Sequence, residues 1–79
     1  MAQRLPPLTV EQILAWADAH HARTGGWPSP GSGPVAGAPG EDWGDIDIAQ
    51  CAGYRGLPRG GSLARLLARH GRGRGAAGG

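Results

Sequence analysis

The sequence of 79 residues contains no lysine, no phenylalanine and only one cysteine. A single cysteine excludes a disulfide within the chain and fits a reducing compartment, so a cytoplasmic location is the expectation. No apolar run approaches the roughly 20 residues of a membrane-spanning helix, and the first residues lack the apolar centre of a signal peptide. The sequence therefore predicts neither a membrane span nor export.

Acidic residues are missing from the last third of the chain. Residues 1–52 contain two arginines and all six acidic residues, a net charge of −4, whereas residues 53–79 contain six arginines and no acid, a net charge of +6. Guanidinium groups without counter-charge repel one another until a polyanion or an acidic partner neutralises them. Because lysine is absent, every strong cation is a planar fork that can bind phosphate bidentately, although GC-rich coding would give the same arginine usage.

Length and glycine content limit the fold. A chain of this size forms one domain and buries only about 60% of its unfolded surface. It has 16 glycines and 7 prolines, gathered mainly in residues 25–40, 56–61 and 71–79. Regular structure is therefore expected as short elements between these breaks.

A first helix is predicted from Val10 to Arg23. Thr9 stands three residues before Gln12, the spacing of a capping box, and the glycines at 25 and 26 provide the end. The apolar face of this helix has the expected helical spacing, and it comprises Val10, Ile13, Leu14, Ala17 and His21, with Trp16 on its flank.

Residues 25–40 are predicted to form a long Gly/Pro-rich loop, because their prolines prevent a regular helix or a central strand. Trp27 is expected to anchor this loop on the helices. Since the chain has no phenylalanine, Trp16, Trp27 and Trp43 are expected to supply the aromatic part of the core.

Two further helices are predicted. The second begins near Glu41, where acidic residues favour the positive helix N-terminus, and ends at Gly53. The third runs from Leu63 to His70 after Ser62 as N-cap. Its leucines 63, 66 and 67 are expected to face inward, and its arginines 65 and 69 outward as an i, i+4 pair.

The predicted fold is an all-α, small three-helix bundle in which the second and third helices form a helix-turn-helix-like pair. The domain is expected to span residues 5–71. Residues 72–79 lack apolar side chains that would repay their ordering entropy, so they are predicted to form a disordered Arg/Gly tail.

Five short motifs follow one another along the chain: Ile13-Leu-Ala-Trp16, Thr24-Gly-Gly-Trp-Pro28, Asp42-Trp43, Gly56-Leu-Pro and Leu63-Ala-Arg-Leu-Leu. This order resembles the helicase-associated domain and the related repeat beside HNH homing endonucleases, as in tandem-repeat proteins of planctomycetes. The resemblance covers about Leu5 to Gly71. It implies a three-helix unit that contacts DNA or RNA and that belongs with adjacent repeats or a larger parent protein.

The predicted contact surface lies on the third helix, the preceding turn and the tail. Arginines there can contact phosphates, and Ser62 with the exposed amides of the helix start can add an anion site. The predicted nucleic-acid-binding residues are Arg55, Arg59, Ser62, Arg65, Arg69, Arg72 and Arg74. A solvated helix face is the alternative, but such a face usually mixes charges of both signs.

We therefore expect a non-enzymatic module that binds DNA or RNA through the phosphate backbone, with the third helix against phosphates or in the major groove. The alternative is a protein-interaction repeat or adaptor that uses the same arginine-rich face. No cofactor, metal, membrane or small-molecule substrate is expected.

Other candidate sites are explained more simply. Tyr54 can stack on a base, but packing is favoured for it. The histidines and Cys51 lack the spacing of a zinc site. The acidic residues 41, 42, 45 and 47 are expected from the helix dipole alone. No serine, cysteine or histidine has a partner for nucleophilic catalysis.

Overall fold

Three α-helices and one 3₁₀ helix make up the regular structure of residues 7–72, the part of the chain that the computed structural model describes. They are α1 (Val10–Thr24), η1 (Pro30–Ser32), α2 (Trp43–Ala52) and α3 (Leu63–Arg69). The β-type pairing within this part is one isolated bridge between Pro34 and Asp42. The predicted all-α, three-helix class is confirmed. The predicted tail lies outside the described residues, except for Arg72.

The first helix begins and ends where its caps predict. Thr9 Oγ1 accepts a hydrogen bond from Gln12 N at 3.1 Å. At the other end Gly25 has φ 83°, a conformation that favours glycine, and its N–H donates to His21 O at 2.8 Å. Ile13 and Ala17 are fully buried. α1 ends at Thr24, one residue after the predicted end at Arg23.

The loop between α1 and α2 is more closely packed than its composition predicts. Trp27 stacks on His21 with 4.0 Å between the ring centroids, which confirms its role as an anchor. Val35, for which the sequence predicts no role, is 5% exposed, and its N–H donates to Glu41 O at 3.0 Å. Residues 25–42 thus cover the core, and η1 packs against α2.

The second helix begins at Trp43, with Asp42 as its N-cap. The Asp42 carboxylate accepts from Gly44 N at 2.7 Å. Glu41, which was expected to favour the helix N-terminus, lies outside the helix and is only 8% exposed. Gly53 ends α2 in the left-handed region, with φ 79°.

The third helix has the predicted cap and the predicted faces. Ser62 Oγ accepts from Arg65 N at 3.1 Å, and the three leucines are buried while the two arginines are exposed. α3 packs against α2. The ten residues from Gly53 to Ser62 join them, whereas a DNA-binding helix-turn-helix uses a turn of about 3–4 residues.

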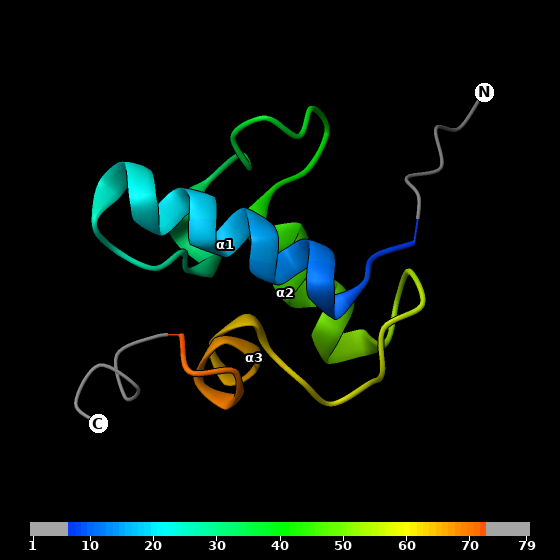
Figure 1. The fold of residues 1–79 in the computed structure, drawn as a ribbon. Helices are drawn as coiled ribbons and strands as arrows, with labels where there is room; N and C mark the ends of the chain where they lie inside the picture. The colour runs from blue at the N-terminus through cyan, green and yellow to red at the C-terminus, as the bar shows by residue number, and fades with distance from the viewer. Residues whose placement is uncertain (1–6, 73–79) are drawn as a thin grey trace.

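One hydrophobic cluster connects the three α-helices. Trp43 and Ile46 of α2 and Leu63 of α3 are at most 1% exposed, and Trp16 and Trp27 pack against the cluster from its edge. The expectation that the tryptophans supply the aromatic part of the core is confirmed for Trp43, whereas Trp16 and Trp27 are only partly buried. Figure 1 shows α1 crossing α2, with α3 on the opposite side from the tip of the loop before α2. Among residues 7–72, no helix has the length and apolar character to cross a membrane.

Candidate functional site

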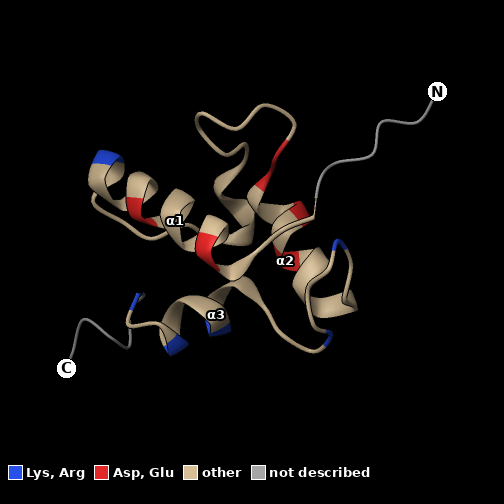
Figure 2. Cartoon of the chain, turned by 45° about the vertical axis from the view of Figure 1, so that its right-hand side comes forward, with Lys and Arg blue, Asp and Glu red and all other residues tan. Residues whose placement is uncertain are grey.

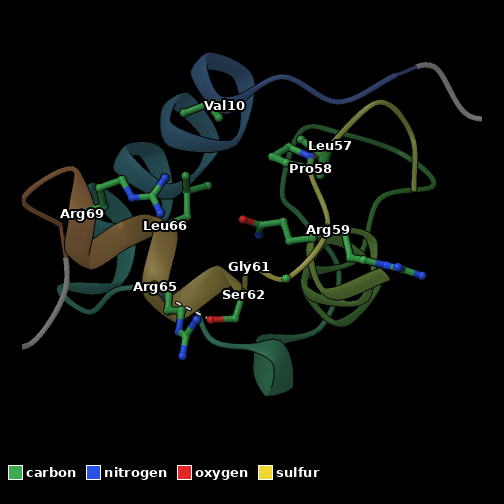
Figure 3. Close-up of a pocket in the computed structure, with 11 residues that line it drawn as sticks. Val10, Leu57, Pro58, Arg59, Gly61, Ser62, Arg65, Leu66 and Arg69 are labelled. Atoms are coloured by element: carbon green, nitrogen blue, oxygen red, sulfur yellow. Dashed lines mark hydrogen bonds between the residues drawn. The ribbon is translucent and has the colours of Figure 1, made fainter. Parts of the chain in front are cut away.

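A groove lies between α3 and the loop that precedes it, and we call it the arginine groove. It encloses about 230 Å³. Its basic and hydroxyl residues are Arg59, Ser62, Arg65 and Arg69, its apolar walls are Val10, Leu57, Pro58 and Leu66, and Gln50 with two glycines completes it. In Figure 3, Arg65 and Arg69 extend from α3, and Arg59 extends from the loop, away from α3. The guanidinium groups thus occupy the rim.

The end of α2 holds the loop wall of the groove in place. Gly60 N donates to Cys51 O at 3.1 Å, and Gly61 N donates to Gln50 O at 3.2 Å, so the loop returns along the last turn of α2. This close approach requires glycine at position 53 for two reasons. A Cβ there would lie 3.1 Å from Arg59 Cβ, and the residue has a positive φ, which favours glycine.

The arginines of the groove have no acidic counter-charge. None of the residues that line the groove is Asp or Glu. Within residues 7–72, no carboxylate lies within ion-pair distance of Arg59, Arg65 or Arg69, and all three are exposed. Figure 2 shows that the charged positions of α3 and of the preceding loop are all basic, whereas acidic positions lie on α1, on α2 and just before α2. The charge division of the sequence is therefore also a division in space.

Ser62 lines the groove, but the predicted anion site at the start of α3 is already used. The Ser62 hydroxyl accepts from Arg65 N, and Leu63 N donates to Asp47 Oδ1 at 2.9 Å. A carboxylate of α2 thus occupies the place where an anion was expected. Two of the amides that were expected to be open to an anion, those of Leu63 and Arg65, are thus hydrogen-bonded within the protein.

Arg55, which was predicted to contact nucleic acid, does not line the groove. It donates two hydrogen bonds to the carboxylate of Glu41, at 2.8 and 2.7 Å, and these raise the pKa of its guanidinium. The side chains of Arg55 and Glu41 are 16% and 7% exposed. Arg55 also has φ 55°, and its carbonyl accepts from Leu8 N at 2.9 Å. Its role is structural, because a buried acid already neutralises it.

Arg72 is likewise paired within the protein. Its Nε and Nη2 donate to the carboxylate of Asp18 on α1, at 2.6 and 3.0 Å. These hydrogen bonds raise the pKa of Arg72 and lower the pKa of Asp18 below its usual 3.8. Arg72 therefore contacts α1 and not the groove, contrary to its assignment to a disordered tail. Arg74 lies outside the described residues.

Gln50 is the residue of the groove that the sequence did not indicate. It is 6% exposed, and its Nε2 has no hydrogen-bond partner within residues 7–72. Gln50 lies near the end of α2, and no sequence signal places it in one groove with the arginines of α3. That juxtaposition arises from the fold of the loop.

Tyr54 is 60% exposed, so the packing that was favoured for it is wrong. Its backbone N–H donates to Ala49 O at 2.8 Å as part of the end of α2. Tyr54 does not line the groove. Its exposed ring therefore adds nothing to the geometry of that site.

The described residues contain no group of three or more His, Cys, Asp or Glu side chains that could hold a metal ion. His20 contacts the edge of Trp43, with 6.1 Å between ring centroids, and His21 stacks on Trp27. Glu41, Asp42 and Asp47 each accept the hydrogen bonds described above. These residues therefore have structural partners.

Comparison with protein-family models, with curated proteins and with solved structures finds no match to this chain. The resemblance to the helicase-associated domain stays a hypothesis. The geometry of the arginine groove is therefore the basis on which a function can be proposed.

Proposed function

We propose that this chain is a non-enzymatic nucleic-acid-binding module in which Arg59, Arg65 and Arg69 contact the phosphate backbone. The observation that carries the proposal is the contrast among the arginines of residues 53–72. Two of them pair with acids of the protein, while the three at the groove are exposed and have no carboxylate partner among residues 7–72.

The arrangement of these residues suits a phosphate backbone. Arg65 and Arg69 stand one helical turn apart on the exposed face of α3, so about 6 Å separates their Cβ atoms. Arg59 adds a cation on the loop side of the groove, with its side chain directed away from α3. Arginine binds phosphate oxygens bidentately, and such contacts fix position without reading sequence. The helicase-associated resemblance agrees with this function.

The test is a titration of labelled duplex DNA, duplex RNA and single strands over a range of salt concentrations. Binding should weaken steeply with salt, because each phosphate contact releases counterions. Arg65→Ala and Arg69→Ala should each reduce the log-log salt slope by about 0.9 on duplex DNA and about 0.7 on single strands.

The matched control is Arg23→Ala, which removes the same charge from the last turn of α1. Val10, where α1 meets the groove, stands 13 residues earlier in the same helix, about 20 Å away along its axis. Arg23→Ala should leave the slope unchanged. If Arg23→Ala and Arg65→Ala change the salt slope equally, binding depends on the net charge of the protein and not on the groove. No binding by the folded chain at low salt would refute the proposal and favour an adaptor for an acidic protein surface.

A further inference from the structure

The arginine groove contains a polar group that the fold leaves unsatisfied. Gln50 comes from α2, lines the groove and is 6% exposed, and its Nε2 has no partner within residues 7–72. Native proteins seldom leave a buried amide group unpaired, because it has lost its hydrogen bonds to water. An unpaired group in a groove is therefore evidence for a ligand that completes its hydrogen bonding.

The rest of the groove limits the shape of that ligand. Leu57 and Pro58 stand on one side and Leu66 on the other, with Val10 nearby, so the walls are apolar. The volume of about 230 Å³ is below the roughly 300–1,000 Å³ of pockets for drug-sized molecules. The occupant is thus one small group with apolar faces and a polar edge, attached to an anion that reaches the arginines of the rim.

A nucleotide combines these properties. We infer that the arginine groove takes one unpaired adenine of a single strand, with Gln50 hydrogen-bonded to the edge of the base and Arg65 and Arg69 on the adjoining phosphates. This inference rests on the nucleic-acid-binding function proposed above and assigns Gln50 as its specificity-determining residue.

Adenine is favoured because a glutamine amide matches its edge and because it has larger apolar faces than cytosine, the other base with a donor beside an acceptor. Adenine presents a donor at N6 beside an acceptor at N7, and a glutamine amide presents the complementary acceptor and donor. The Nε2 atom is buried in the free protein, so the amide must rotate toward the groove for both of its groups to meet the base. A base that is stacked and paired in a duplex cannot enter a groove of this size. The ligand must therefore be an unpaired strand.

The inference is tested with short thymidine strands that carry adenine, guanine, cytosine or an abasic site at one central position. The adenine strand should bind about tenfold more tightly than the abasic strand and the all-thymidine strand. Gln50→Met keeps the size and burial of the side chain but removes the amide, so it should abolish this preference and leave the salt slope intact. Gln12→Met on the exposed face of α1 is the matched control and should keep the preference.

The outcomes separate the two proposals. Salt-dependent binding without base preference, or a preference that persists in Gln50→Met, overturns the role of Gln50 but retains the nucleic-acid-binding function. Tighter binding of a duplex of equal charge overturns the requirement for an unpaired base. Absence of binding to every strand overturns both proposals.

A second measurement does not depend on a variant that folds. The side-chain amide signals of Gln50 and Gln12 are followed by NMR in the wild-type protein as the adenine strand is added. Only the Gln50 signals should shift, and they should move less with the abasic strand. Unchanged Gln50 signals at saturation would overturn the inference.

Discussion

Two arginine sites border the loop between α2 and α3, and they differ in what neutralises their charge. At the start of the loop, Arg55 forms two hydrogen bonds with the nearly buried carboxylate of Glu41. At the end of the loop, the arginine groove gathers Arg59, Arg65 and Arg69 without an acid among its lining residues. The same residue type thus serves the fold at one site and remains available to a ligand at the other.

Burial explains this difference. A guanidinium group that leaves water must receive a counter-charge from the protein, because the desolvation cost otherwise amounts to several kcal/mol. An exposed guanidinium group keeps its hydration and requires no partner. The comparison therefore predicts large stability effects at the Glu41 site and small ones in the groove.

The largest expected effect is that of Glu41→Ala, which leaves Arg55 in a mostly buried position without its carboxylate. The free energy of unfolding should fall by about 3 kcal/mol. Glu41→Gln keeps a hydrogen-bond acceptor and should cost less. Urea denaturation followed by tryptophan fluorescence measures both. Glu11→Ala, an exposed acid in the first turn of α1, is the control. If it costs as much as Glu41→Ala, the contrast between the two sites is lost.

In the groove, Gln50→Met should leave the free energy of unfolding unchanged or raise it by about 1 kcal/mol. The substitution removes a buried nitrogen that has no partner within residues 7–72, and it keeps the volume of the side chain. The measurement is the same urea denaturation, with Gln12→Met as the reference. A loss of more than about 1 kcal/mol would show that the amide stabilises the fold and would weaken its assignment to ligand recognition.

The ends of the helices show what the sequence can predict. Thr9, Ser62 and Gly53 define helix ends through contacts with residues nearby in the chain, so their roles follow from local spacing. The apolar face of α3 follows from helical periodicity in the same way. The element order and most of the helix bounds were therefore predictable.

The partners of the arginines were not predictable, because they lie far away in the chain. Arg55 pairs with an acid 14 residues earlier, and Arg72 with one 54 residues earlier. Counting charge within residues 53–79 treats all arginines alike, so it could not separate paired from unpaired ones. Gln50 was missed for a related reason, since only the return of the loop along α2 brings it to the groove.

Removing the arginines of α3 should have little effect on stability. Arg65 and Arg69 are like charges at i, i+4, an arrangement that is destabilising by about 0.2–0.5 kcal/mol. Arg65→Ala with Arg69→Ala should therefore keep the free energy of unfolding within about 0.5 kcal/mol of the wild type, with any increase greatest at low salt. Urea denaturation at low and high salt measures this. A large loss would mean that these side chains pack on the core, contrary to their exposure.

The smallest effect is expected at the pair between Asp18 and Arg72, which combines features of the two sites: the charges are paired, but the Asp18 side chain is 48% exposed. The hydrogen bonds from Arg72 lower the pKa of Asp18 below 3.8 in the folded protein. The unfolded chain therefore binds the proton more readily, and the pair stabilises the fold above the unfolded pKa. This contribution is lost as the pH falls through the folded pKa.

Asp18→Asn should accordingly lower the free energy of unfolding slightly near neutral pH and match the wild type in strong acid. Solvent screening makes the difference small, and added salt should shrink it further. Urea denaturation between neutral and acidic pH tests this, and the same substitution in an Arg72→Ala background isolates the pair. If Asp18→Asn has the same pH-dependent effect in both backgrounds, the acid sensitivity belongs to other carboxylates, and exposed pairing contributes nothing to holding Arg72 against α1.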